Sequence, residues 1–330
     1  MQETTRREGR WLGWVMAWMA AAAMFFPGIA HAQAYPSRPV TIVVPFAAGV
    51  VTDVNTRVLA QYLQGHLGRP FLVENKPGAN GMIGAANVAN ARPDGYTLLI
   101  GGNTTHSIVR SIFKTVPYDP IKSFTPIARL FDFCSVLVVH PEIPAQNAME
   151  LVAYLKTNSH KLQYGYGNAG GLVAGELLRR AAGVDLARVA YRSNPQGLTD
   201  LISGNIKMMV VDFGLGVPQI SAGKIRAMAV NTRIRSPLLP NVPTFGETFA
   251  PGVDAAGWAG VFGPANLPGE VVAVLGPVLK KFSEDPEMNR QIGTAGTQAA
   301  WVSPSEMPAF LAADIVRWTN LAKDAGIKPE

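Results

Sequence analysis

One short segment of this 330-residue chain has residue types that suit anion binding by the backbone. Phe46, Ala47, Ala48, Gly49 and Val50 offer main-chain groups and, after the phenylalanine, little side chain. An apolar β-branched run precedes them, and apolar residues at helical spacing follow. The first turn of a helix carries unpaired N–H groups and the positive end of the helix dipole. These residues therefore suit a carboxylate-binding loop, and equally a tight turn that packs the helix on the strand.

The sequence lacks the motifs of phosphate binding, dinucleotide binding, serine catalysis and metal binding. No Gly-Lys-Ser/Thr follows the loop, the remaining glycines of a dinucleotide fingerprint are missing, and the chain contains no Gly-x-Ser-x-Gly. Asp53 and His106 suggest parts of a triad but have no serine at a sharp turn, and Asp53 is also placed to cap a helix. His66, His106, His140 and His160 are far apart in sequence, so we expect no metal and no cofactor.

The N-terminus and the charge indicate an exported globular protein. A basic start, an apolar stretch at 11–26 and Ala30-His31-Ala32 predict a signal peptide at residues 1–32, cleaved near Ala32-Gln33, and a periplasmic location. Removing it takes away three Arg and two Glu, which changes the net charge from +6 to +5. The positive residues are scattered, so we expect no nucleic-acid partner. The single Cys134 excludes an internal disulfide.

Strand and helix patterns alternate along most of the chain. Buried strands are predicted at 40–44, 96–102 and 135–140, and helices between them. This alternation predicts an α/β protein with parallel sheets and helices on both faces. Ligands of such sheets bind beyond the carboxyl ends of strands, where the glycine-rich loops lie.

Long motifs resemble those of a known family. "YPSRPVTIVVPFAAGVVTD", "VENKPGANGMIGAANVANARPDGYTLLIG", "AGELLRRAAGVDLARVAYR" and "LPNVPTFGE" are similar in sequence and order to Bug-type extracytoplasmic solute receptors, the binding proteins of tripartite tricarboxylate transporters. The resemblance covers essentially the whole mature chain.

The resemblance implies a type II periplasmic-binding-protein fold, with two α/β domains and a ligand cleft between them. Domain 1 would comprise residues 33–137 and 256–330, and domain 2 residues 138–255. Backbone amides and ordered waters near Phe46–Val50 would hold the ligand carboxylate, with Asp53 supporting the waters. The other implied site residues are Asn103, Thr104, Thr105, Tyr166, Gly167, Asn168, Ala169 and Asp212.

This chain departs from the family pattern at two loops. The usual Pro-Pro-Gly-Gly is Ala47-Ala48-Gly49-Val50, and the second loop lacks the family's serines and introduces Tyr166. A changed loop path or less room for water could follow. These changes favour a monocarboxylate, or an aromatic carboxylate stacked on Tyr166, as the ligand.

Three functions remain open at this point. The first is a monomeric receptor that delivers a small carboxylate to membrane permease subunits. The second is a receptor that presents its closed form to a two-component sensor kinase. The third, an enzyme, needs a nucleophile or metal cluster that the sequence does not show.

Overall fold

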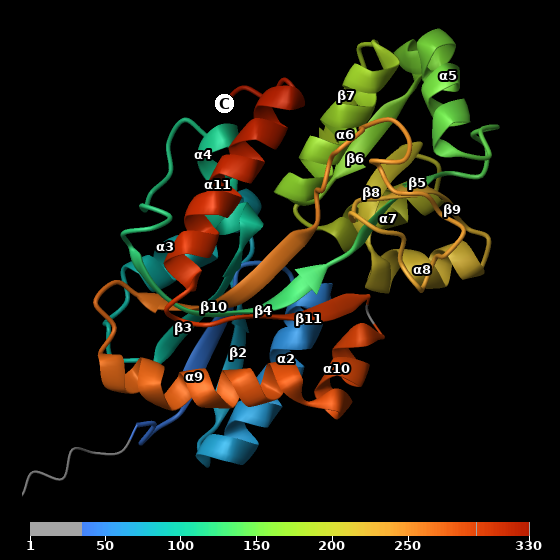
Figure 1. Ribbon diagram of the computed structural model, residues 1–330. Helices are drawn as coiled ribbons and strands as arrows, with labels where there is room; N and C mark the ends of the chain where they lie inside the picture. Colours follow the sequence, from blue (N-terminus) through green and yellow to red (C-terminus); the bar gives the residue numbers. More distant parts are fainter. Residues whose placement is uncertain (1–34, 295, 330) are drawn as a thin grey trace, which may run out of the picture. The chain divides into compact units, whose positions relative to one another are not determined.

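The computed structural model describes residues 35–294 and 296–329, and the account below concerns the chain from Arg38 onward (Figure 1). The signal peptide predicted at residues 1–32 lies outside the described residues. The strands are β1 (Val40–Val44), β2 (Phe71–Asn75), β3 (Thr97–Gly102), β4 (Phe124–Phe133), β5 (Ser135–Val139), β6 (Gln163–Tyr166), β7 (Ala187–Ala190), β8 (Met208–Asp212), β9 (Arg226–Val230), β10 (Gly257–Pro264) and β11 (Thr297–Val302). The helices are α2 (Val51–Leu67), α3 (Met82–Ala89), α4 (Val109–Ile112), α5 (Ala148–Asn158), α6 (Ala169–Ala182), α7 (Asn194–Ile202), α8 (Phe213–Ser221), α9 (Gly269–Glu284), α10 (Pro286–Gly293) and α11 (Met307–Asp324), with short turns η1 (Ala79–Gly81), η2 (Asn103–Ser107) and η3 (Ser159–Lys161).

The strands form two sheets, and the α/β class predicted from the sequence is confirmed. One sheet has the order β11-β4-β10-β3-β1-β2, and the other has the order β7-β6-β8-β5-β9. The chain passes from the first sheet to the second at Cys134, directly between β4 and β5, and returns between β9 and β10 (Figure 1). We call the two halves the first and the second lobe after their sheets.

Both sheets are mixed, so the expectation of purely parallel sheets was wrong. β1, β2 and β3 are parallel, but β10 runs antiparallel to β3 and β4. In the second lobe β5 runs antiparallel to β8, so that Ser135, its first residue, pairs with Asp212, the last residue of β8. The physical reason is that β5 and β10 enter their sheets from the other lobe without a preceding helix, whereas right-handed βαβ crossovers produce the parallel strands.

Helix α11 contributes to the hydrophobic cores of both lobes. Its first half buries Met307 and Leu311 among residues of the first lobe, such as Trp258 and Phe262. Its second half buries Trp318 and Leu321 with residues of α5, α6 and the second sheet. The C-terminal helix therefore joins the two lobes by apolar packing, although it follows the first lobe in sequence.

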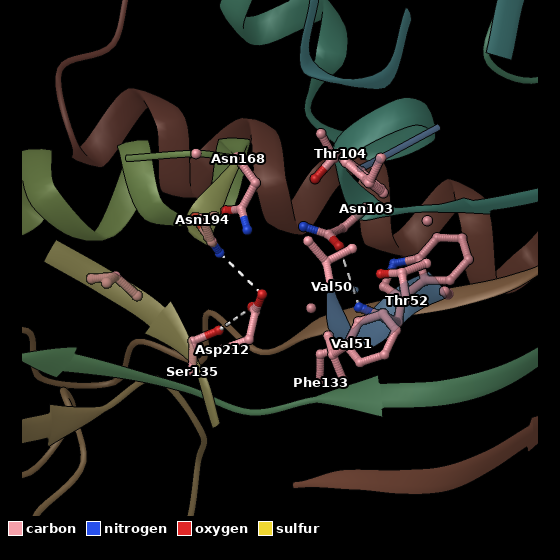
Figure 2. Close-up of a pocket in the computed structure, with 18 of the residues that line it drawn as sticks. Val50, Val51, Thr52, Asn103, Thr104, Phe133, Ser135, Asn168, Asn194 and Asp212 are labelled. Carbon is pink, nitrogen blue, oxygen red and sulfur yellow. Dashed lines mark hydrogen bonds between the residues drawn. The ribbon is translucent and has the colours of Figure 1, made fainter. Parts of the chain in front are cut away.

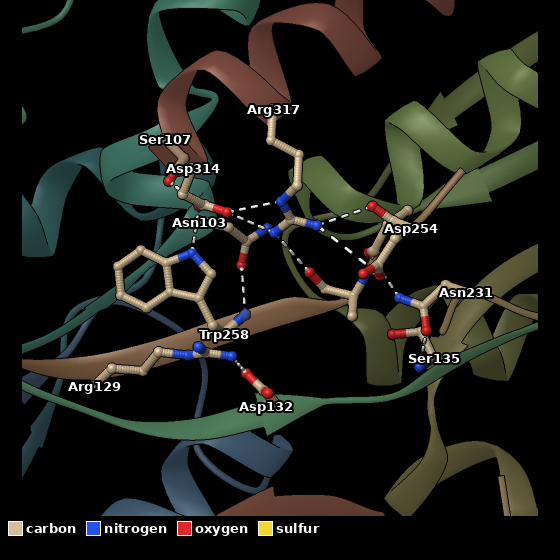
Figure 3. Close-up of polar contacts among 12 residues, drawn as sticks. Asn103, Ser107, Arg129, Asp132, Ser135, Asn231, Asp254, Trp258, Asp314 and Arg317 are labelled. Carbon is tan, nitrogen blue, oxygen red and sulfur yellow. Dashed lines mark hydrogen bonds and ion pairs between the residues drawn. The ribbon is translucent and has the colours of Figure 1, made fainter. Parts of the chain in front are cut away.

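A polar cluster fixes α11 to the segment that returns from the second lobe (Figure 3). The Arg317 guanidinium donates to the carbonyl oxygens of Asp254 and Ala256, at 2.9 and 3.3 Å, and to Asp314 Oδ1. Asp314 Oδ2 accepts from Trp258 Nε1 at 2.5 Å and from Ser107 Oγ at 2.5 Å. We call these residues the Arg317 clamp. The clamp ties the return segment to the first lobe.

No helix within the described parts of the chain has both the length and the apolar character needed to cross a membrane.

Candidate functional site

A cavity lies between the two lobes, at the carboxyl ends of β3 and β8 (Figure 2). Its empty volume is about 800 Å³, with the open mouth included. The first lobe and the crossing segments supply Phe46, Val50, Val51, Thr52, Ile100, Gly101, Gly102, Asn103, Thr104, Phe133, Ala255, Gly257, Trp258 and Ala259. The second lobe supplies Ser135, Gly167, Asn168, Gly170, Ser193, Asn194, Val210, Asp212 and Asn231.

The N-termini of four helices converge on this cavity. The N-cap residues of α2, α6, α7 and α8 are Val50, Asn168, Ser193 and Asp212, and all four line it. Each helix has nine or more residues, so each adds partial positive charge and N–H donors at its first turn. The cavity therefore has a field suited to an anion although it lacks a lysine or arginine lining residue.

The loop before α2 is shaped by its own backbone and by Asp53. Gly49 has a φ of +82°, which glycine adopts without strain, whereas Val50 is extended at −74°. The first intrahelical hydrogen bond runs from the Val54 N–H to the Val50 carbonyl. The N–H groups of the first three helical residues, Val51 among them, precede that bond and have no intrahelical acceptor. Replacement of the family's second glycine by Val50 therefore requires no strained backbone.

Asp53 stabilises this loop through hydrogen bonds. Its buried carboxylate accepts hydrogen bonds from the Gly49 N–H at 2.9 Å, from Asn75 Nδ2 at 2.9 Å and from Arg57 Nε at 3.1 Å. Asn75 Nδ2 also donates to the Phe46 carbonyl. Burial raises the pKa of Asp53, but the hydrogen bonds from Arg57, Gly49 and Asn75 outweigh it and lower the pKa below its usual value. The carboxylate thus holds the loop in place, and its oxygens are occupied by the protein.

Asp212 is placed differently. It is the N-cap residue of α8, yet its side chain makes no capping hydrogen bond. The carboxylate instead accepts from Asn194 Nδ2 at 3.0 Å and from Ser135 Oγ at 3.3 Å (Figure 2). Burial raises the pKa of Asp212, and the hydrogen bonds from Asn194 and Ser135 oppose that rise.

Of the residues predicted from the sequence, one group lines the cavity: Phe46, Val50, Asn103, Thr104, Gly167, Asn168 and Asp212. The others lie outside the lining: Ala47, Ala48, Gly49, Asp53, Thr105, Tyr166 and Ala169.

Two of the outlying residues have clear structural contacts. Thr105 Oγ1 accepts from the Gly102 N–H at 3.0 Å and so stabilises the turn η2. The Tyr166 ring is partly buried against the core of the second lobe, with its centroid 6.2 Å from that of Tyr164. Tyr166 therefore lies outside the lining of this cavity, and stacking of a ligand on its ring stays a prediction.

Sequence reasoning missed several polar lining residues, namely Thr52, Ser135, Ser193, Asn194 and Asn231. Ser193 and Asn194 could have been found, because Ser-Asn-Pro after a predicted strand is a helix-start signal. Ser135 and Asn231 have no local signal. They meet because Asn231 Oδ1 accepts from the Ser135 N–H at 2.7 Å, 96 residues away in the chain.

Metal and acid–base chemistry find no support in the described residues. No three His, Cys, Asp or Glu side chains gather there in a way that could hold a metal ion. His106 is buried beside Phe262, at a ring distance of 4.1 Å, and burial lowers its pKa to about 3. It is therefore a neutral core histidine at physiological pH.

A comparison with protein families identifies the chain. The model of the tripartite tricarboxylate transporter family receptor matches residues 55–327. The chain belongs to this family. Members of this family are solute receptors and not enzymes. A curated relative from Bordetella bronchiseptica, a member of the UPF0065 group of proteins, is 34% identical over 302 residues, which cover 91% of this chain and 89% of the relative.

Solved structures of periplasmic binding proteins share the receptor fold. Rpa4515 of R. palustris, solved with adipate, has a TM-score of 0.86 and 32% sequence identity, over 90% of this chain and all of that one. MatC of Rhodopseudomonas palustris, solved with bound malate, has a TM-score of 0.80 and 29% identity, over 87% of this chain and all of that one.

Proposed function

We propose that the receptor is exported to the periplasm and captures a small carboxylate between its two lobes. The backbone N–H groups at the start of α2 and ordered water hold the carboxylate, and Asn103, Thr52 and Thr104 surround it. The observation that carries this proposal is the convergence of four helix N-termini on a cavity without a basic side chain. The adipate and malate in the two similar structures are carboxylates of this kind.

The two lobes then act as domains that close on the ligand; they correspond to the predicted ranges 33–137 with 256–330 and 138–255, with the first boundary at Cys134, before β5. Closure follows if the ligand binds the closed state more tightly than the open one. The closed receptor delivers its ligand to the permease subunits of a tripartite tricarboxylate-type transporter. The family description supports delivery to a transporter rather than presentation to a sensor kinase.

The start of α2 allows a direct test of backbone binding. Val51 is the first helical residue, where proline is tolerated because its N–H has no intrahelical partner. Val50 is already extended, as the residue before a proline must be. Val51→Pro therefore removes one N–H donor without breaking the helix. Val51→Ala is the matched control, because it removes the same side-chain contacts and keeps the N–H.

We expect Val51→Pro to weaken the binding of adipate or malate, whichever binds the native receptor better, by about 10-fold or more in titration calorimetry. A hydrogen bond to a charged group contributes about 1.5–3 kcal/mol. Val51→Ala should retain most of the affinity. Equal affinities for the two variants would contradict capture by these amides, and absence of binding of every carboxylate to the native receptor would refute the function itself.

A further inference from the structure

The second-lobe wall of the cavity contains an acidic group without a counter-charge. Asp212 is the only titratable side chain among the lining residues, and only 8% of its surface is exposed. Its neighbours Asn194 and Ser135 are uncharged donors, and it does not cap α8. Buried carboxylates are normally paired with a full cation. Here only the partial positive charges at the N-termini of α7 and α8 lie nearby, so this carboxylate has unused capacity to bind a positive group.

Asn194 adds a second acceptor beside Asp212. The Asn194 Nδ2 group donates to the Asp212 carboxylate, which has no proton to donate when it is ionised (Figure 2). The other end of the amide, Asn194 Oδ1, is an acceptor. That Oδ1 is buried and has no hydrogen-bond partner among the described residues, and Asn194 is 4% exposed.

Gly167 has no side chain to crowd Asn194 Oδ1. A Cβ on Gly167 would lie 2.5 Å from Asn194 Oδ1, closer than side-chain atoms approach one another. Both residues line the cavity, as does Asp212. The wall thus combines a carboxylate that accepts from two uncharged groups with an amide oxygen that has no partner among the described residues, so the donors of a ligand can reach both.

We propose that the ligand of this receptor is a carboxylate that also carries a protonated amine, and that Asp212 and Asn194 select the amine. This inference rests on the proposed binding of the carboxylate at the start of α2. An ammonium group has three N–H donors and a positive charge, so it satisfies the Asp212 carboxylate and Asn194 Oδ1 together. A second carboxylate in the same place meets an anion and an acceptor, which disfavours simple dicarboxylates.

Matched ligands test the selection of the amine. Titration calorimetry on the mature receptor would compare ω-amino acids of three to six carbons with the diacids and the unsubstituted monoacids of equal length. The α-amino acids of the same lengths form a fourth set, because the amine can lie near either end of the chain. We expect the best amine-bearing carboxylate to bind at least 10-fold more tightly than the matched diacid and monoacid.

Asp212→Asn tests whether Asp212 causes this preference. The change keeps the shape and removes the charge, so the affinity for the amine-bearing ligand should fall at least 10-fold relative to the affinity for the matched monoacid. Asp200→Asn is the matched control in the same lobe, because Asp200 lies on α7 outside the cavity lining and bonds Tyr191 Oη. Should Asp212→Asn fail to fold, Asn194→Ala removes the second acceptor and should weaken the amine-bearing ligand selectively.

The outcomes separate this inference from the proposed function. If diacids bind as tightly as amine-bearing ligands, or if Asp212→Asn weakens all carboxylates equally, selection of an amine is refuted while carboxylate capture stands. If Val51→Pro leaves every affinity unchanged but Asp212→Asn abolishes the preference, the amine site stands and capture by the α2 amides is refuted. If no carboxylate binds the native receptor, both proposals fail.

Discussion

At the scale of single residues, the two acidic groups predicted for the site have opposite environments. The Asp53 oxygens receive three protein donors, one of them on a guanidinium, and its pKa is lowered. Asp212 receives two uncharged donors in a buried cavity, and its pKa is raised. The same residue type therefore stabilises a loop in one place and remains available to a ligand in the other.

The raised pKa of Asp212 predicts how stability depends on pH. Because the folded protein holds this proton more tightly than the unfolded chain, the group favours folding below the ordinary carboxyl pKa. That contribution is lost as the pH rises through the folded-state value. Asp212→Asn has no such charge, so the ligand-free variant should melt at a higher temperature than the native protein at neutral pH.

Thermal unfolding followed by circular dichroism from pH 4 to pH 8 measures this effect. The difference in melting temperature between variant and native protein should be small at pH 4 and should grow as the pH rises. A constant difference across the range would contradict the prediction, since other titrating groups are common to both proteins.

At the scale of elements, the segment from β1 to α2 depends on contacts with a neighbouring strand. Asn75 is the last residue of β2 and pairs in register with Val44, the last residue of β1. From there its side chain reaches both Asp53 and the Phe46 carbonyl. The parallel pairing of β1 and β2 thus positions the loop before α2, whose amides we propose as the carboxylate donors.

Asp53→Ala should loosen this loop and destabilise the protein. The Gly49 N–H and the Asn75 amide lose their acceptor, which corresponds to about 1–3 kcal/mol of unfolding free energy for a buried network. Arg57→Ala removes a half-exposed guanidinium and leaves the Gly49 and Asn75 donors to Asp53 in place, so it should cost less. Urea unfolding measures the free energy of unfolding of both variants, and we expect the lower value for Asp53→Ala. Calorimetry should also show weaker carboxylate binding for Asp53→Ala. Equal stability of the two variants would argue against the loop-holding role.

At the scale of the whole molecule, the two lobes are joined by more than two chain crossings. Helix α11 packs into both cores, and the Arg317 clamp bonds the return segment. Asn103, a cavity residue, accepts from the Trp258 N–H at 3.3 Å, and Trp258 Nε1 donates to Asp314 in the clamp. The cavity and the clamp therefore share Trp258.

Arg317→Ala should lower stability and widen the range of lobe positions. The Asp314 carboxylate, on a residue 4% exposed, loses its cation, and two carbonyls lose a donor. We expect a loss of about 1–3 kcal/mol of unfolding free energy, since Arg317 itself is one-third exposed. Arg317→Lys keeps the positive charge but loses the planar guanidinium that donates to several acceptors at once. The stability of this variant should therefore fall between those of the native protein and Arg317→Ala.

Small-angle X-ray scattering tests the effect on lobe movement. The ligand-free Arg317→Ala variant should show a larger radius of gyration than the native protein, and saturating ligand should reduce the difference. An unchanged radius in the ligand-free variant would restrict the clamp to a role in stability.

The sequence by itself determined the alternation of strands and helices, the small-residue loop before α2 and the family. These features are encoded within short windows, where β-branched runs, helical spacing and capping residues act locally. The same reasoning missed β4, because Pro126, Arg129 and Asp132 interrupt the apolar pattern of this strand. It also did not show that Tyr166 lies outside the cavity lining, because a position next to a loop does not reveal which face of β6 a side chain occupies.

Only the tertiary structure decided which polar groups meet in the cavity. Ser135, Asn194 and Asp212 are 18 to 77 residues apart along the chain. The strand order β7-β6-β8-β5-β9 brings the end of β8 beside the start of β5, and the α7 N-terminus lies against both. Contacts between distant segments depend on strand order and crossing direction, which local residue patterns do not specify. For that reason the small-residue loop before α2 was recognisable from the sequence, whereas the cluster of Ser135, Asn194 and Asp212 on the second-lobe wall was not.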